Sequence, residues 1–414
     1  MRILLISLWY HPEPVTKPHD LAAQLARRGH QVYAITGFPN YPSGRLYPGY
    51  RLRPRQAETL DGARVVRVPH VVDRSQSALR RLVSYSSFAI SAAAVGGQSV
   101  PRPDVIWTYQ VGLPGVLLSA LTGAPLVHEV QDLWPEWGHT AQLRGLKGGL
   151  YRLLDAQERW IYRRAAAVTT ISEGFCRALM AKGVPQERLH LIANWANEAH
   201  FRPVPRDPEL GRREGLLDRF NVMYVGNVGT AQGLGLVLAT AERLRDLPKL
   251  QFVVIGDGVE RRALETQAAE RELSAVRFLG SRPPEVVAHY LAYADAVLLP
   301  LLRNPVYEIT IPSKTYAYLA AGRPILVSAA GDVAELVRSA GAGVVCPPED
   351  PDALALAIRR MAEMPEEQRE ALGQAGRQAF LSRFTRDLQM DRYEALFNKV
   401  AKVGIMGATP RRTP

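Results

Sequence analysis

The chain has 414 residues, of which 47% are hydrophobic and 22% are charged, a composition that excludes both a small stapled module and a disordered chain. It has two cysteines, Cys176 and Cys346, so neither a disulfide framework nor a cysteine-based metal site is expected. No run of about eighteen apolar residues is present, so we expect neither a membrane-spanning helix nor a signal peptide. The sequence therefore predicts a cytoplasmic protein.

Basic residues are concentrated in the first half of the chain. Residues 1–200 carry 23 Lys and Arg against 14 Asp and Glu, whereas residues 201–414 carry 28 against 26. A basic face of this kind predicts an anionic partner, namely phosphate, a lipid headgroup or nucleic acid. The alternative is a solvated arginine-rich surface.

The first half alternates short apolar runs with helical spacing. Residues 2–7 form an apolar run, Leu21 and Leu25 show helical spacing up to Arg28, and residues 32–36 form a second apolar run. Such a strand, helix, strand unit belongs to a parallel sheet that is covered on both faces. Further predicted elements of this half are strands at 64–68, 105–108, 125–130 and 167–171, and helices at 77–95, 112–122 and 145–164.

A polar, proline-rich stretch at residues 189–209 predicts an interdomain linker. The alternation then restarts, with predicted strands at 221–225, 251–255, 276–279, 296–300, 324–327 and 343–345. We therefore predict an α/β protein of two doubly wound, Rossmann-like domains facing an interdomain cleft. The predicted parts are domains at 1–196 and 197–384, a C-terminal helix at 385–402 that packs back on the first domain, and a flexible tail at 403–414.

Ligands of such domains bind beyond the carboxyl ends of the strands, where several loops of this chain contain glycine. Gly226, Gly229 and Gly256 follow predicted strands, and glycine lets the backbone approach a phosphate at a helix start. The alternative is that these turns need glycine for their geometry alone.

The segment from Thr310 to Lys314 is more informative. Pro312 and Ser313 are favoured at a helix start, and Lys314 places a cation beside the first-turn amides. We expect an anion cradle here, with Arg303 as a second cation. The alternative is an ordinary capped helix with a surface lysine.

The order of the motifs resembles the GT-B glycosyltransferases, specifically the retaining family 4 enzymes of O-antigen, capsule and exopolysaccharide synthesis. The resemblance covers nearly the whole chain. Its motifs are Trp9-Tyr10-His11-Pro12-Glu13, Arg28-Gly29-His30, Gly37-Phe38-Pro39-Asn40-Tyr41-Pro42, Gln131-Asp132-Leu133-Trp134-Pro135-Glu136, Ser172-Glu173-Gly174, Asn194-Trp195, Gly226-Asn227-Val228-Gly229, Gly256-Asp257-Gly258 and Pro312-Ser313-Lys314. It implies a hexosyltransferase that moves sugar from a nucleotide-diphosphate donor, usually UDP-linked, with retention at the anomeric carbon and without a metal. The first domain would bind the acceptor and the second the nucleotide sugar.

The resemblance also assigns donor-site residues. The diphosphate falls on Thr310–Lys314 and the base on the loop that contains Arg282. Many members have an Arg and a Lys where this chain has Asn227 and Gln232, so Arg303 and Lys314 carry more weight here.

The acidic residues of the donor site depart from the family pattern. Many members carry two glutamates where this chain has Ile309 and Ala317, and Glu308, one residue away, is the candidate replacement and is predicted to be catalytic. Glu335 matches a frequent family glutamate; a helix-dipole role is the alternative.

Catalysis requires a group that can deprotonate the acceptor hydroxyl. Asp132 is the candidate because it follows the strand at 126–130, at the ligand edge of the sheet, and because the resembling enzymes use a His or Asp in this segment. Glu136 and His128 are the rivals, and capping of the following turn is the alternative for Asp132.

The basic and apolar segment at residues 74–88 is typical of an interfacial helix. We expect Arg74, Arg80 and Arg81 to rest on an anionic membrane, on the inner face of the plasma membrane, where a polyprenyl-diphosphate-linked or other glycan acceptor is held.

Other readings remain open. A UDP-sugar 2-epimerase shares this fold, and a basic nucleic-acid-binding protein would explain the charge of the first half, although aromatic interleaving and known reader motifs are missing and no nucleic-acid partner is predicted. A nicotinamide dehydrogenase is disfavoured because Ser7-Leu8-Trp9 replaces a glycine fingerprint after the first strand.

Overall fold

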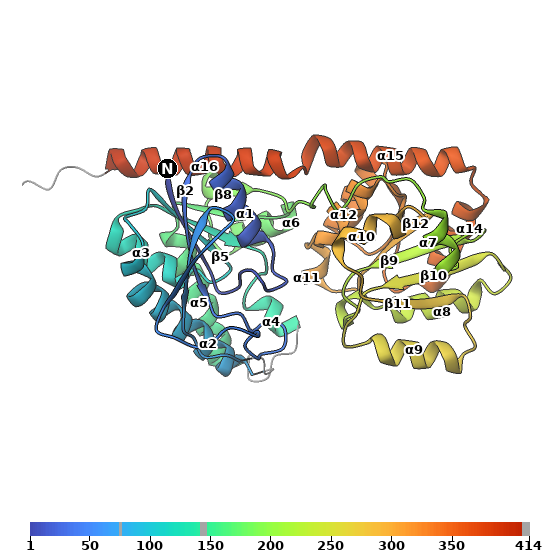
Figure 1. The fold of residues 1–414 in the computed structure, drawn as a ribbon, viewed down its shortest axis with the longest axis horizontal. Coiled ribbons are helices and arrows are strands. Elements are labelled where there is room, and N and C mark those ends of the chain that lie inside the picture. Colours follow the sequence, from blue (N-terminus) through green and yellow to red (C-terminus); the bar gives the residue numbers. More distant parts are fainter. Residues whose placement is uncertain (74–76, 141–146, 408–414) are drawn as a thin grey trace, which may run out of the picture. The chain divides into compact units, whose positions relative to one another are not determined.

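The computed structural model describes residues 1–73, 77–140 and 147–407, which divide into two compact units. The first unit contains residues 1–171 and 175–192 and the chain from Met390 onward; the second contains residues 172–174 and 193–389. The chain therefore enters the second unit at Ala193 and returns to the first within its last helix (Figure 1).

The first unit is built on an eight-stranded sheet in the order β3-β4-β2-β1-β5-β6-β7-β8. All neighbouring strands pair in parallel except β3 and β4, which are antiparallel. The strands are β1 (Arg2–Ser7), β2 (Gln31–Gly37), β3 (Gln56–Leu60), β4 (Ala63–Val68), β5 (Val105–Tyr109), β6 (Leu126–Val130), β7 (Ala167–Thr170) and β8 (Leu189–Leu191). The central strands β1, β5 and β6 are almost wholly buried, as parallel strands covered on both faces must be.

Helices and short turns connect these strands. They are α1 (Lys17–Arg27), α2 (Ala78–Ser91), η1 (Ala92–Gly96), η2 (Gly97–Ser99), α3 (Leu113–Thr122), α4 (Glu136–Thr140), α5 (Gly148–Arg164), α6 (Glu173–Ala181) and η3 (Gln186–Arg188). The predicted linker at 189–209 is wrong at its start, because residues 189–191 form β8. This edge strand is short and only half-buried, so it lacks the apolar run by which the other strands were recognised.

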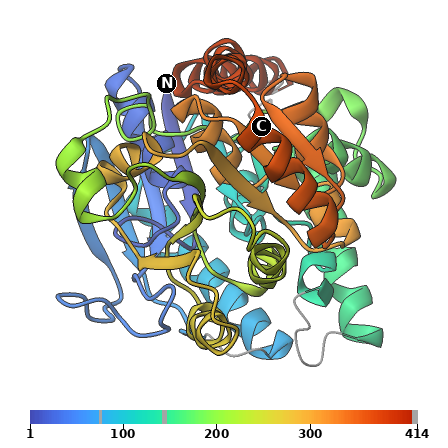
Figure 2. The ribbon, with the colours of Figure 1, turned by 90° about the vertical axis from the view of Figure 1, so that its right-hand side faces the viewer.

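The second unit is a six-stranded, all-parallel sheet in the order β11-β10-β9-β12-β13-β14. Its strands are β9 (Phe220–Val225), β10 (Leu250–Ile255), β11 (Val276–Gly280), β12 (Ala296–Pro300), β13 (Ile325–Ser328) and β14 (Gly343–Cys346). Its helices and turns are α7 (Pro208–Arg213), η4 (Thr230–Gln232), α8 (Gly235–Arg243), α9 (Arg261–Glu270), α10 (Pro284–Leu291), α11 (Pro305–Glu308), α12 (Ser313–Ala321), α13 (Asp332–Ser339), α14 (Pro351–Glu363) and α15 (Glu366–Arg383). Figure 2 shows α8 and α9 nearly end-on beneath the strands of this unit.

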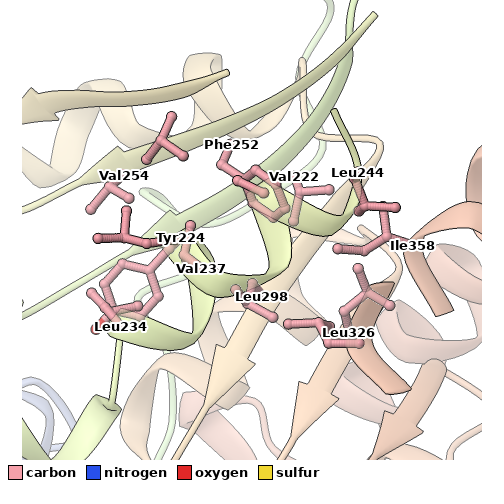
Figure 3. Packing of buried hydrophobic residues seen from close by; sticks show 14 of the residues in the cluster. Val222, Tyr224, Leu234, Val237, Leu244, Phe252, Val254, Leu298, Leu326 and Ile358 are labelled. Carbon is pink, nitrogen blue, oxygen red and sulfur yellow. The ribbon is translucent and has the colours of Figure 1, made fainter. Parts of the chain in front are cut away.

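One hydrophobic core of the second unit lies between its sheet and the helices α8 and α14. Val222, Tyr224, Val254, Leu298 and Ile358 are buried there from three strands and α14 (Figure 3). Burying such side chains contributes roughly 1.5–3 kcal/mol each. Tyr224 is part of this packing, and its hydroxyl reaches the ligand edge described below.

The last helix, α16 (Arg386–Gly407), belongs mainly to the first unit. Tyr393 is fully buried and donates a hydrogen bond to Glu129 Oε2 on β6, at 2.7 Å. Lys17 Nζ on α1 lies 2.7 Å from the other oxygen of that carboxylate. On the outer side, Glu394 accepts from Arg28 and His30. These contacts attach the end of the described chain to β6 and α1.

Candidate active site

Both sheets reverse their direction of winding at one point, which is where ligands of such sheets bind. In the first unit the reversal lies between β1 and β5, and in the second between β9 and β12. The two candidate sites lie at the carboxyl ends of these strand pairs, and each is described within its own unit.

The glycines of the second unit bring two loops into contact. Gly226 N donates to Ile255 O, and Val228 N donates to Asp257 O. Gly256 has φ +147°, and a Cβ there would lie 1.8 Å from Gly226 O. Glycine is therefore required at residue 256 by the close approach of two backbones, as the alternative interpretation of these loops had it.

Gly229 and its polar neighbours form an ordered turn beside this contact. Gly229 N donates to Gln232 Oε1 at 3.2 Å, and a Cβ on Gly229 would lie 2.6 Å from Asn227 Nδ2. The side chain of Gln232 thus forms a hydrogen bond within the turn, and the side chain of Asn227 lies next to Gly229.

Lys314 lies at the reversal point of the second sheet. Its Nζ donates to Tyr224 Oη at 2.5 Å and lies 4.1 Å from the centre of that ring. A Cβ on Gly226 would be only 3.3 Å from the same Nζ, so the lysine lies directly against the loop that follows β9. Burial lowers the pKa of Lys314 to about 7, and no carboxylate of the described chain pairs with it. A bound anion would restore its full charge.

The start of α12 adds backbone donors. Ser313 is exposed, Pro312 occupies the N-cap position, and no side chain caps the helix. Thr315 N donates to Pro312 O at 2.9 Å, whereas the amides of Ser313 and Lys314 have no side-chain acceptor at this positive end of the helix dipole. Thr310 is engaged locally, because its hydroxyl donates to Val306 O at 2.6 Å. Lys314 thus lies beside an uncapped helix start, and the anion cradle stays a prediction.

The remaining predicted donor residues have local partners. Arg303 is exposed, and its backbone amide donates to Glu349 Oε2 at 2.8 Å. Arg282 donates through Nε to Tyr290 Oη at 2.9 Å. Glu308 is half-buried at the end of α11. Glu335 forms an exposed ion pair with Arg338 at 2.6 Å, an arrangement typical of a helix surface.

The first unit contains a cavity of about 250 Å³ at its own reversal point. Residues at the ends of β1, β5 and β6 line it, and its wall includes six Tyr and Trp rings: Trp9, Tyr41, Tyr85, Tyr109, Trp134 and Trp137. The rings of Trp9 and Tyr85 pack edge to face with their centres 6.2 Å apart, and those of Trp134 and Trp137 do so at 6.1 Å. Such a wall presents apolar faces and polar edges to a ligand.

Asp132 provides an acidic group in this cavity. The side-chain amide of Gln110, a residue with φ +62°, makes two hydrogen bonds to the backbone of Asp132. Gln110 Nε2 donates to Asp132 O at 2.8 Å, and Asp132 N donates to Gln110 Oε1 at 3.1 Å. The side chain of Asp132 remains exposed to the cavity and makes no hydrogen bond within the described chain, so it does not cap the following turn. Although the side chain is exposed in the cavity, the protein around it partly desolvates its carboxyl, which raises the pKa to about 6.

The two rivals of Asp132 have other roles. Glu136 forms a 2.7 Å ion pair with Lys182, which Asp155 also contacts. His128 is buried within β6, bonded to Thr108 Oγ1 at 2.8 Å, and burial lowers its pKa to about 4. Neither side chain lines the cavity.

The predicted membrane segment forms α2, whose N-cap is Ser77. Arg80 is exposed, whereas Arg81 lines the aromatic cavity 6.0 Å from the centre of the Trp137 ring. Arg74 lies outside the described residues. Leu79 and Ile90 are 61% and 66% exposed on the same helix.

Sequence reasoning missed Gln110 and most of the aromatic wall. Gln110 follows β5, so its position at a strand end was the available signal. Except for Trp134 and Trp137, which are three residues apart, the rings come from distant segments that no spacing along the chain relates.

Two doubly wound α/β sheets, each with a candidate ligand site at its reversal point, define a protein of the GT-B class. Residues 14–195 match the family described as "Glycosyl transferase 4-like domain", and residues 209–379 match "Glycosyl transferases group 1". The chain belongs to the family 4 glycosyltransferases of the GT-B fold.

Relatives similar to nearly the whole chain, or to two thirds of it, are named as glycosyltransferases. The chain is 30% identical over 386 residues to the putative colanic acid biosynthesis glycosyl transferase WcaI of Escherichia coli, covering 88% of this chain and 93% of the relative. It is 29% identical over 284 residues to the probable glycosyltransferase WbjE of Pseudomonas aeruginosa, covering 67% and 69%.

Solved structures share the fold at low identity. HepE of Anabaena in complex with UDP has a TM-score of 0.72 at 16% identity, covering 96% of this chain and all of that one. Sucrose-phosphate synthase of Thermosynechococcus elongatus has a TM-score of 0.73 at 21% identity, covering 97% and 99%.

Proposed function

We propose that this glycosyltransferase moves a sugar from a UDP-linked donor to a hydroxyl group of a lipid-linked saccharide, with retention at the anomeric carbon, in the synthesis of a cell-surface polysaccharide. The observation that carries the proposal is Lys314, a lysine without a carboxylate partner in the described chain, beside the uncapped start of α12. The UDP complex of HepE, and the naming of WcaI as a putative colanic acid biosynthesis glycosyl transferase, support the choice of donor and product.

The donor half of the reaction needs positive charge. Breaking the bond between the sugar and the diphosphate leaves negative charge on the phosphate oxygens. Lys314 and the first-turn amides of α12 are placed to stabilise that charge, which is the largest contribution a protein can make to such a step. We propose that these groups neutralise the leaving group without a metal ion. Transferase activity should therefore persist when a metal chelator is added.

The acceptor half needs an oriented hydroxyl and a base. The aromatic wall of the first unit offers apolar faces to a sugar ring, and Asp132 is exposed in the same cavity. With a pKa of about 6, its carboxylate is ionised at neutral pH and can accept the hydroxyl proton.

The acceptor is proposed to be membrane-bound. No described helix is long and apolar enough to cross a membrane. We propose instead that α2 holds the protein peripherally on the inner face of the plasma membrane, with Leu79 and Ile90 in the lipid and Arg80 at its phosphates. Exposed basic residues of the first unit such as Arg80 then contact lipid and not nucleic acid.

Thermal unfolding in the presence of UDP tests the donor site. UDP at a hundred times its dissociation constant should stabilise the wild type by about 2.7 kcal/mol. Lys314→Met should lose most of this stabilisation, whereas Lys249→Met, at an exposed lysine of the same unit, should keep it. Equal stabilisation of both variants would contradict the assignment.

The affinity for UDP should also depend on pH. Because the pKa of Lys314 is about 7 in the free protein and an anion favours its charged form, UDP binding takes up a proton. Affinity should therefore fall as the pH rises above 7, and calorimetry in buffers of different ionisation enthalpy would detect the uptake. Lys314→Arg should flatten this dependence, because arginine stays charged.

A further inference from the structure

A second cavity, of about 470 Å³, lies within the second unit at the opposite edge of its sheet. Asp295 and Pro324, which line it, immediately precede β12 and β13. Because the strands are parallel, this edge is the one away from Lys314 and the loop at Gly226. The C-terminal end of α12 and one face of α15 complete the wall. The cavity is therefore separate from the donor site.

Four arginines from three parts of the chain line this cavity: Arg206, Arg323, Arg369 and Arg377. Three carboxylates accompany them: Asp295, Glu366 and Glu370. The charges are not closely matched. Arg206 lies 3.9 Å from Glu366, and Arg369 lies 3.7 Å from Asp295, both beyond the length of a charged hydrogen bond.

The hydrogen bonds of these guanidinium groups go to the backbone instead. Arg206 donates to Ala292 O at 3.1 Å, and Arg377 donates to Ala320 O at 2.5 Å at the end of α12. These bonds hold the arginines in place, while each uses only part of the guanidinium donors.

Arg323 is the least satisfied of the four. It is half-buried in the cavity wall and makes neither a hydrogen bond nor an ion pair within the described chain. Burial and repulsion from Arg206 lower its pKa, while attraction from Asp295, Glu370 and Glu366 opposes them. Because none of these carboxylates forms a direct ion pair with Arg323 in the described chain, its guanidinium donors stay available to an anionic ligand.

We propose that this cavity binds a sugar phosphate, with the phosphate monoester held by Arg323 and Arg206. A guanidinium matches the geometry of phosphate oxygens through two parallel hydrogen bonds. The volume lies within the range of small-molecule sites and exceeds what a lone phosphate needs. Gln374, Gln378 and Glu370 supply donors and acceptors for sugar hydroxyls.

Calorimetric titration of the full chain, with UDP in saturating amount, tests the proposal independently of the donor site. Glucose 6-phosphate should bind, glucose should not, and inorganic phosphate should bind at least tenfold more weakly than the ester. Equal binding of glucose and its phosphate, or no binding of the ester, would overturn the assignment.

Variants locate the binding. Arg323→Gln and Arg206→Gln should each weaken the binding of glucose 6-phosphate at least tenfold. Arg262→Gln, on the exposed surface of α9, should leave this affinity unchanged. Arg323→Gln should unfold at the same temperature as the wild type or higher, because burial and repulsion from Arg206 together outweigh the attraction from the nearby carboxylates. Binding that survives both cavity variants, or a tenfold loss in Arg262→Gln, would place the site elsewhere.

Vesicles distinguish a soluble phosphate ester from a lipid headgroup. Sedimentation with phosphatidic acid vesicles should be the same for the wild type and Arg323→Gln, because the phosphate site is recessed. Vesicle binding that depends on Arg323, without binding of glucose 6-phosphate, would contradict a sugar-phosphate ligand.

Discussion

At the scale of single residues, the environment of a side chain separates candidates that the sequence leaves equivalent. Asp132 and Glu136 are four positions apart, and both are acidic. Glu136 is neutralised by Lys182, whereas Asp132 has no partner within the described chain and a raised pKa. An unpaired carboxylate exposed in a cavity is available for proton transfer.

Replacing Asp132 tests its role as the base. Asp132→Asn should lower kcat/KM by about 10²–10⁴-fold, because the amide cannot accept the hydroxyl proton. Steady-state kinetics with a lipid-linked acceptor would measure the loss. Glu136→Gln is the matched variant in the same segment and should retain far more activity.

The pH profile gives a second signature of the same group. A base must be ionised, and burial sets the pKa of Asp132 near 6, so kcat/KM should fall about tenfold for each pH unit below 6. The residual activity of Asp132→Asn should lack this acidic limb. A limb that persists unchanged in the variant would assign the ionisation to another residue.

At the scale of elements, backbone contacts shape the ligand edge as much as side chains do. The loops after β9 and β10 touch at Gly226 and Gly256, and Tyr224 joins the core to Lys314. The donor site therefore depends on the packing of the strands beneath it.

Gly256→Ala should disrupt this edge. Its Cβ would meet Gly226 O at 1.8 Å at a φ of +147°, so one of the two loops must move. We expect a loss of about 3 kcal/mol or more in the free energy of unfolding, together with weaker UDP binding. Denaturant unfolding would measure it, with Gly235→Ala as control, because a Cβ there meets nothing within 4 Å. A neutral Gly256→Ala would contradict the described approach of the two loops.

Helix α2 should bind anionic membranes. Each arginine near the headgroups contributes about 1 kcal/mol, so Arg80→Gln should weaken sedimentation with phosphatidylglycerol vesicles roughly fivefold. Arg188→Gln, at an exposed position in the same unit, is the control. Equal binding to neutral and anionic vesicles would remove the electrostatic part of the proposal.

At the scale of the whole molecule, the C-terminal helix α16 packs on the first unit, which is otherwise formed by the first half of the chain. Tyr393 and Glu129 are 264 positions apart and share a hydrogen bond in a buried setting. Burial alone would raise the pKa of Glu129, but Lys17 and the hydroxyls of Thr169 and Tyr393 hold it below its usual value.

Tyr393→Phe should destabilise the first unit. A hydrogen bond to a charged group contributes about 1.5–3 kcal/mol, and its loss leaves the carboxylate with one donor fewer. Urea unfolding should show this loss, whereas Tyr33→Phe, in the same unit, should change stability little. A neutral Tyr393→Phe would mean that this bond does not hold the helix.

The local pattern of residues was enough to predict the alternation of strands and helices, the two sheets, the strand end before Asp132 and the helix start that carries Lys314. Buried parallel strands are short apolar runs, and their carboxyl ends can be read directly from the chain. The strands β3 and β8 were missed because edge strands are half-exposed and lack such runs.

Contacts between distant segments decided the rest. Strand order, the aromatic cavity, the engagement of Glu136 by Lys182 and the arginine cavity beneath β12 and β13 all join residues that no local spacing relates. Charge, burial and pKa depend on neighbours in space, so only the folded chain separates a paired carboxylate from a free one.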